Sequence, residues 1–563
     1  MRMRHLGTCF FISLLLYFPG SEGKELSTLE FIDSIAPPGL MEGVGNSHLE
    51  ISTEISDAQA FFDQGVSLLH DFWYFEAYRA FLHASSLDPN APMPHWGRYR
   101  AAQNMANLDR EEREALLEEI VNTIKRLRDA GSQREKYYLD SVIALHDEDG
   151  DAATEAHNRE LVALLEAYPD ELEARLFLWQ RLDNGYDAAG KPRREQLYAE
   201  MLLAGELDEN GDHHGLLHYW IHNQEPGAHP ESALDAAKRL ANLAPNAGHI
   251  VHMPGHIHYL MGNYDLAHEQ FVRAQETEER YQAEHSIEPI FTWNYLHNFS
   301  FMTSNLAEAG RLQIGATYAK KLQDIAEASS FKHLPSFEML LGRPILEHGF
   351  MAIRLERFEE AAALIGDERW SALEKSERLS AMQRAYAAYS AGMAAALLGD
   401  ANAGRRYSQE LDSVLWRSHR DEVSLGYRQT PLEVAALELQ GMIAAAQNDY
   451  DTAIEILERA VTQEAEIGYG EPRANIHPAA ESLARVKLMT ADYEGAREAY
   501  QSVLKKRPNA GMPLYGIARS YELEGREVEA KAAYEDFLKA WSEADADLEQ
   551  VQEASAWLER KNR

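Results

Sequence analysis

Histidines are concentrated in one stretch of this 563-residue sequence. Of the 23 histidines, nine lie between His213 and His258, and the others are spread over the rest of the chain. A neutral imidazole nitrogen is a good ligand for zinc, copper and iron. The clustering therefore predicts a transition-metal site, provided that the secondary structure brings these side chains to a common point.

The first part of this stretch, DHHGLLHYWIHNQEP, has the spacing of one helix face. His214, His218 and His222 step by four residues, so on an α-helix they span about 80° of rotation. Glu225 returns to the same stripe, although Pro226 disfavours helical geometry there. We predict the three histidines as metal ligands and Glu225 as a ligand or a general base.

The second part, GHIVHMPGHIHYLMG, repeats the pattern. His249, His252 and His256 step by three and four residues, and Pro254 either kinks their helix or begins it. A helical pattern between the two parts predicts two neighbouring helices joined by short turns. His297 opens a later helical segment and could reach the same groove. All four histidines are predicted metal ligands.

The available donor atoms limit the chemistry of this site. Cys9 is the single cysteine, so thiolate ligands and disulfide frameworks are excluded and the ion must be held by His, Asp or Glu. Copper, zinc and iron all suit such ligands. Tyr219 follows His218 where the zinc-protease helix motif has its catalytic glutamate, so that motif is excluded. A buried histidine network without metal, or a site for an anion or small ligand, stays open.

Net charge narrows the classes of partner. Asp and Glu number 91 against 54 Lys and Arg, which gives a net charge of −37. Such a surface repels phosphate backbones and anionic lipid, so nucleic acid is excluded as a partner, as is a membrane beyond the export signal. No Gly-rich phosphate loop or nucleophile elbow occurs in the sequence.

Internal repeats predict the scaffold. In the stretch 61–89, Gly65, Ala77, Phe81 and Pro89 have the spacing of a tetratricopeptide repeat, in which two antiparallel helices occupy about 34 residues. Small residues let the two helices approach closely, and Phe81 is expected to fill the gap between repeats. The frame recurs along the chain, so the predicted fold is all-α, a tetratricopeptide-like helical-repeat solenoid with a concave groove.

Six segments are predicted along the chain. Residues 1–23 have basic residues, a short apolar run and a small-residue end, which is typical of a signal peptide and predicts a periplasmic or secreted protein. The remaining boundaries are a loose lead-in (24–55), an N-terminal repeat region (56–205), a central His-rich region (206–330), C-terminal repeats (331–545) and a tail (546–563).

These residues together resemble a group of bacterial tetratricopeptide-repeat proteins. The group has a central HxGxxHYxIHxxE motif, here from His213 to Glu225, followed by a segment similar to AGHIVHMPGHIHYLMGNY. Later elements are His297-Asn298 and Tyr469-x-Glu471-Pro472. Relatives often carry a histidine where this chain has Ser300. The resemblance implies the fold and the position of the site, not a reaction.

Three functions are compatible with these patterns. The first is a metal-dependent enzyme in which an open coordination position activates water or dioxygen, in a hydrolytic or oxidative reaction. The second is an interaction scaffold that takes a peptide or small molecule in its concave groove, with a structural histidine network. The third is a periplasmic metal carrier.

Overall fold

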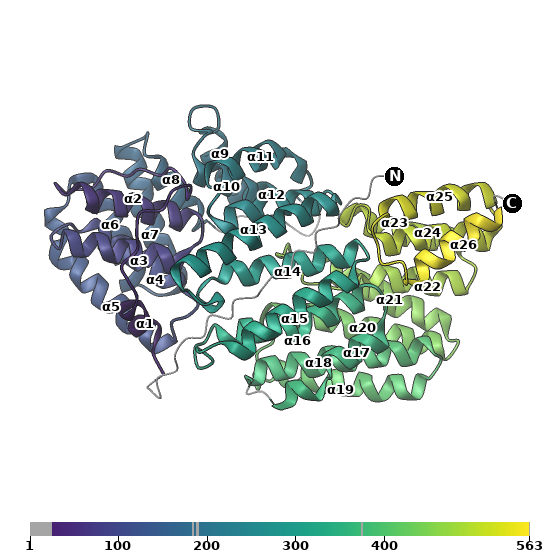
Figure 1. The fold of residues 1–563 in the computed structure, drawn as a ribbon. Coiled ribbons are helices and arrows are strands. Elements are labelled where there is room, and N and C mark those ends of the chain that lie inside the picture. Colours follow the sequence, from purple (N-terminus) through teal and green to yellow (C-terminus); the bar gives the residue numbers. More distant parts are fainter. Residues whose placement is uncertain (1–24, 183–184, 187–190, 373–374, 562–563) are drawn as a thin grey trace, which may run out of the picture.

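A computed structural model describes residues 25–182, 185–186, 191–372 and 375–561. The predicted signal peptide lies outside the described residues. Within these ranges the chain is all-α and forms a helical-repeat solenoid, and its one extended pairing is an isolated bridge between Tyr186 and Pro192 (Figure 1). The predicted fold class is confirmed.

The helices follow one another with short connections. Those up to the end of the N-terminal region are α1 (Thr28–Ser34), α2 (Ser56–His70), α3 (Tyr74–Leu87), α4 (Met93–Asn104), α5 (Arg110–Leu127), η1 (Arg128–Ala130), α6 (Gln133–Asp147), α7 (Gly150–Ala167), α8 (Leu172–Trp179) and α9 (Arg194–Ala204). The central region contains α10 (His214–Gln224), η2 (Pro230–Ala233), α11 (Leu234–Leu243), α12 (Gly248–Leu260), α13 (Tyr264–His285), η3 (Pro289–Phe291), α14 (Trp293–Glu308) and α15 (Leu312–Ala328). The C-terminal region contains α16 (Phe337–Arg354), α17 (Phe358–Ile365), η4 (Glu368–Ala372), α18 (Glu377–Leu397), α19 (Ala401–His419), η5 (Gly426–Arg428), α20 (Gln429–Ala446), α21 (Tyr450–Ala465), α22 (Ala479–Met489), α23 (Tyr493–Lys506), α24 (Gly511–Glu524), α25 (Glu527–Ala540) and α26 (Glu549–Lys561).

Glycines set the close packing within and between the helix pairs. A Cβ on Gly65 in α2 would lie 2.5 Å from the ring of Phe81 in α3, and one on Gly97 in α4 would lie 2.3 Å from the same ring. Phe81 therefore fills the space between three helices, as its position in the repeat predicted. In the central region Gly255 of α12 packs on Phe271 of α13 in the same way.

The first helices of successive pairs form a continuous row. α10 contacts α12, α12 contacts α14, and the row continues through α16, α18, α20 and α22 to α24. Side chains on the facing surfaces of α10, α12 and α14 are therefore brought together, although they come from different repeats. This row positions the histidines.

The solenoid curls so that its last repeats contact its middle. The Tyr264 hydroxyl donates to the carbonyl of Pro508 at 2.8 Å, and the Trp541 Nε1–H donates to the carbonyl of Glu308 at 2.8 Å. In the segment predicted as a tail, α26 buries Ala554 and Trp557 against the preceding pair. A terminal helix of this kind covers the apolar face that the last repeat would otherwise expose.

The lead-in is packed rather than loose. Val44, Leu49 and Ile51 are buried, and the main chain of Gly43 accepts a hydrogen bond from Asn246 N–H at 2.9 Å. The sequence prediction failed here because these apolar residues have no helical spacing. Among the described residues no helix combines the length and the apolar character that crossing a membrane requires.

Candidate metal centre

The two histidine stripes face each other from adjacent helices. His218 and His222 lie on α10, and His249, His252 and His256 lie on α12. α12 runs unbroken through Pro254, so the second stripe is wholly helical. Because α10 contacts α12, these five predicted ligands are brought together.

Glu225 joins the two helices. It is the C-cap of α10, and its backbone N–H still bonds to the carbonyl of Ile221. One carboxylate oxygen lies 2.7 Å from His222 Nδ1 and the other lies 2.8 Å from His256 Nδ1. The side chain is buried. Its role is therefore to hold two imidazoles from opposite sides through Nδ1.

Two further imidazoles are also held through Nδ1. His218 Nδ1 donates to the carbonyl of His70, and His252 Nδ1 lies 2.7 Å from Asn298 Oδ1. The Asn298 amide group donates to the carbonyl of Phe271 at 2.8 Å, which fixes Oδ1 as the acceptor toward His252. Metal-binding histidines typically donate their second ring N–H to an acceptor in this way.

With Nδ1 anchored, the Nε2 atoms point at one another. His252 Nε2 and His256 Nε2 are 2.6 Å apart, and His218 Nε2 and His222 Nε2 are 3.0 Å apart. Two nitrogens bound to one tetrahedral zinc ion at about 2.0–2.1 Å are themselves about 3.3 Å apart. The distance between His218 and His222 is close to this spacing, whereas His252 and His256 are closer together than two ligands of one zinc ion.

Burial keeps most of these rings neutral. It lowers the pKa of His218, His249, His252 and His297 well below the usual value, with the neighbouring histidines adding to the effect. Burial also lowers the pKa of His256, to about 3. A neutral imidazole has a lone pair available for a metal, whereas a protonated one has none.

His222 is the exception. Burial opposes its charge, but the carboxylates of Glu471 and Glu225 more than offset that cost and raise its pKa to about 10. Without metal, His222 is therefore protonated and can donate from Nε2 to His218. A bound cation would replace that proton, since both occupy the same lone pair.

Two histidines of the cluster have ring nitrogens with no hydrogen-bond partner among the described residues. Both nitrogens of His249 are buried and unpaired, and so is Nε2 of His297, which reaches the cluster from α14 as predicted. Leaving a buried polar atom unpaired costs about 1–3 kcal/mol. Such atoms mark a place for a ligand.

Glu471 is a donor whose role the sequence patterns did not assign. It lies in the segment between α21 and α22, and one of its carboxylate oxygens is 3.4 Å from His222 Nδ1. Tyr469 of the same segment is partly buried beside Glu225 and Glu471, and burial together with these carboxylates raises its pKa well above the usual value. The motif Tyr-x-Glu-Pro noted in the sequence was the available signal, but nothing local placed it near the histidines.

These groups form overlapping sets that could each hold an ion. In every set the ligand atoms lie within 4.8 Å of one another. The sets are His218–His222–His249, His249–His252–His297, His256–His297–Glu471 and His222–Glu225–Glu471. The first and the third share no residue, so the cluster has enough donors for two ions.

Aromatic rings enclose the cluster. Phe72 stacks on His222 with centroids 5.6 Å apart, and Phe301 stacks on His256 at 3.9 Å. Trp293 contacts His297 at 5.3 Å. The exposed side is formed by His222 and Glu471, whose side chains are 11% and 29% accessible. Glu471 is therefore the more solvent-exposed of these two donors.

His214 lies apart from this cluster. Its Nδ1 is 3.0 Å from Asn46 Oδ1 in the lead-in segment, and its Nε2 is 3.3 Å from the carbonyl of Ser67. It belongs to none of the sets that could share an ion within the described chain. Its predicted role as a ligand lacks structural support, because the lead-in packs on the first turn of α10.

A separate group, Glu356–His477–Glu481, also has the spacing of metal ligands. Here the positions are filled by protein partners, since His477 Nδ1 lies 2.7 Å from Glu438 and Arg354 pairs with Glu481 at 3.0 Å. Burial opposes the charge on His477, but Glu438 and Glu356 raise its pKa to about 10. This group is an ion-pair network, in which His477 Nε2 also lies 3.5 Å from Glu356.

Comparison with known proteins adds little to this geometry. No family model matches the chain, and no curated protein matches it. Among solved structures, yeast Tom70 is similar with a TM-score of 0.31 and 13% identity, over 90% of this chain and 96% of that one. A likeness at this level carries no functional information.

Proposed function

We propose that this chain is an exported tetratricopeptide-like protein that binds copper, zinc or iron at the histidine cluster and uses the ion in a hydrolytic or oxidative reaction. The cluster consists of His218, His222, His249, His252, His256, His297, Glu225 and Glu471. The contact between His252 and His256 carries the proposal.

Both rings of that pair are neutral at pH 7, and both Nδ1 atoms face hydrogen-bond acceptors. In the neutral form the proton then resides on Nδ1, and each Nε2 presents a lone pair. Two lone pairs 2.6 Å apart in a buried site repel each other. A cation beside them, bound by both lone pairs, removes the repulsion, which favours a metal over a network of hydrogen bonds.

The number of ligands also favours a catalytic ion over a purely structural one. Structural zinc sites are closed by four protein ligands, whereas catalytic sites keep a position open for water or substrate. The sets found here have three ligands each, and the side chain of Glu471 is 29% accessible. A bound ion would supply Lewis acidity or an activated water, and Glu225 and Glu471 are the carboxylates near enough to manage a proton.

An interaction scaffold is the main alternative, because helical-repeat solenoids present extended binding surfaces. It requires the imidazoles to be satisfied by protein groups, which the unpaired nitrogens of His249 argue against. A metal carrier would use the same ligands, but it would release the ion readily to a chelator.

Elemental analysis of untagged protein tests the proposal. We expect at least one equivalent of copper, zinc or iron per chain after reconstitution, and a higher melting temperature with metal than without, because a ligand that binds only the folded state stabilises it. Less than about a tenth of an equivalent after reconstitution with each metal would leave the scaffold alternative. Rapid loss to a weak chelator would favour the carrier.

A further inference from the structure

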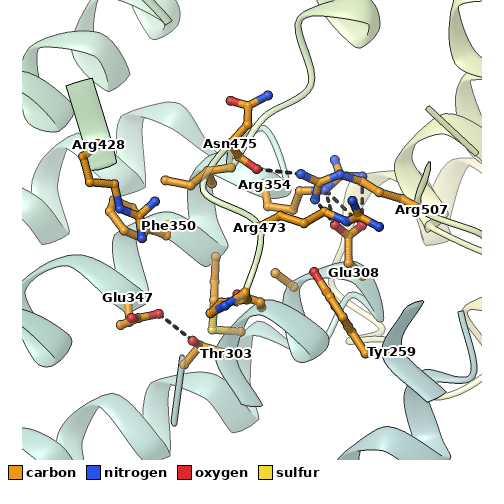
Figure 2. Close-up of a pocket in the computed structure, with 15 residues that line it drawn as sticks. Tyr259, Thr303, Glu308, Glu347, Phe350, Arg354, Arg428, Arg473, Asn475 and Arg507 are labelled. Atoms are coloured by element: carbon orange, nitrogen blue, oxygen red, sulfur yellow. Dashed lines mark hydrogen bonds and ion pairs between the residues drawn. The ribbon is translucent and has the colours of Figure 1, made fainter. Parts of the chain in front are cut away.

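A second polar pocket lies next to the cluster. It is lined by α12, α14, α16 and the segment before α22, and its cavity volume is about 30 Å³. Figure 2 shows Arg354, Arg473 and Arg507 gathered near Glu308, with Arg428 beside Phe350.

The lining has an excess of positive charge in a protein of net charge −37. Four arginines and two glutamates line the pocket. Glu308 pairs with Arg354 at 2.9 Å and also with Arg507, and Glu347 pairs at 2.9 Å with Arg343 outside the lining. The carboxylates of the lining are therefore already matched.

Arg428 and Arg473 have no carboxylate within ion-pairing distance in the described parts of the chain. Arg428 is 8% exposed, donates to the carbonyl of Ala474 at 2.7 Å and lies over the ring of Phe350. Arg473 donates to the carbonyl of Lys506 at 2.6 Å. A guanidinium has five N–H donors, so each retains donors for an oxyanion.

The pocket and the histidine cluster share walls. Glu471 faces the cluster, while Pro472 and Arg473, which follow it, line the pocket. On the other side, Tyr259 of the pocket contacts Phe301 at 5.8 Å, and Phe301 stacks on His256. One layer of aromatic rings and one turn of chain separate the two sites.

We infer that this pocket binds the anionic oxygen group, a carboxylate or a phosphate, of the small molecule on which the histidine cluster acts. Arg473 and Arg428 supply the charge, and the segment 469–473 borders both sites. The role as a substrate anchor rests on the proposed function, whereas binding of the anion does not.

Calorimetric titration of the metal-free protein at constant ionic strength tests the binding. The probes are acetate and inorganic phosphate, with acetamide as the neutral counterpart of acetate. We expect saturable binding of at least one anion, no binding of acetamide, and an affinity at least about tenfold weaker in Arg473→Gln, because a charge-assisted hydrogen bond contributes about 1.5–3 kcal/mol. Arg405→Gln removes an exposed arginine that donates to Asn402, and it should bind as the parent does.

Circular dichroism and melting temperature establish that Arg473→Gln is folded, and Arg428→Lys provides a second variant that keeps the charge but loses the planar fork. Acetate binding without phosphate binding assigns a carboxylate, and the reverse assigns a phosphate. No saturable binding of either anion, or equal binding by both Arg473→Gln and the parent, overturns the inference. Anion binding in a protein that takes up no metal sustains the pocket and rejects the proposed function, so the two failures are distinguishable.

Discussion

Glu225 and His256 are tied across the interface between α10 and α12, with a carboxylate oxygen 2.8 Å from Nδ1. The other oxygen of Glu225 holds His222, so one buried carboxylate orients an imidazole on each helix. This relationship turns two independent histidine stripes into one site. It also means that Glu225 would act on a bound ion through its neighbours as well as by direct contact.

Replacing Glu225 with glutamine tests this role. The amide has one acceptor oxygen, so it can hold His222 or His256 but not both, and we expect metal affinity to fall about 10–100-fold, as is typical when such an outer partner is lost. Competition with a chromophoric chelator measures the affinity. Glu231→Gln, at an exposed position, is the control. An unchanged affinity in Glu225→Gln would remove Glu225 from the site.

His252 and His258 form a matched pair on one helix. His252 is buried in the cluster, whereas His258 lies in α12 outside every set that could share an ion in the described residues. We expect His252→Ala to retain less than half of the metal of the parent and His258→Ala to retain all of it. Elemental analysis of the two variants after identical dialysis gives the answer, and equal losses would contradict the proposed ligand set.

His214 should affect stability without affecting metal. Its ring bonds to Asn46 and lies against Gly45, where an added Cβ would be 2.4 Å from the imidazole. His214→Ala leaves these partners unsatisfied and a cavity behind, so we expect a loss of about 1–3 kcal/mol in the free energy of unfolding. Urea denaturation and metal analysis of the same preparation check both halves of the prediction. Metal loss in a folded His214→Ala protein would restore His214 as a ligand.

The buried carboxyl of Glu278 should make the stability of the protein fall as the pH becomes alkaline. Burial raises the pKa of its carboxyl to about 8, and neither oxygen has a hydrogen-bond partner among the described residues. The pKa of Glu278 is higher in the folded than in the unfolded protein. The stability that its protonated carboxyl gives the fold is therefore fully present below about pH 4.5 and is lost as the pH rises through 8. Glu278→Gln removes this dependence.

The measurement is the melting temperature of parent and variant at pH 5 and pH 9. The melting temperature of Glu278→Gln minus that of the parent should be larger at pH 9 than at pH 5, whatever the difference at pH 5. Glu276→Gln, at an exposed position on the same helix, should show no such gain. A parallel pH profile for parent and Glu278→Gln is the contrary result.

Alanine substitutions at Gly65 and at Gly342 test the effects of close packing and of helix propensity separately. Alanine at Gly65 would place its Cβ 2.5 Å from Phe81, and overpacking of this kind costs about 1–3 kcal/mol. Gly342 lies inside α16 with its nearest neighbour, Leu379, at 3.5 Å from an added Cβ, so alanine there should stabilise by about 0.5–1 kcal/mol. Chemical denaturation of the two variants should therefore give shifts of opposite sign, and two shifts of the same sign would mean that the α2–α3 packing is not as described.

Much of the architecture could be predicted because it rests on local patterns. The four-residue steps of His218 and His222 and the matching steps in α12 put each stripe on one helix face, and short connections make neighbouring helices pack. Gly65 and Phe81 marked the close approach within a repeat in the same way. These relationships join residues that are few positions apart, so sequence spacing determines them.

The contacts that complete the site join residues that are far apart in the sequence. Glu471 reaches His222 from about 250 positions away, Asn46 holds His214 from the lead-in, and Arg473 enters the pocket beside Tyr259, each because the superhelix curls back on itself. The curl is the sum of small rotations between successive helix pairs, and no local pattern encodes that sum. The sequence by itself determined the helices and the faces that carry imidazole; the tertiary structure alone decided which carboxylates and arginines meet them.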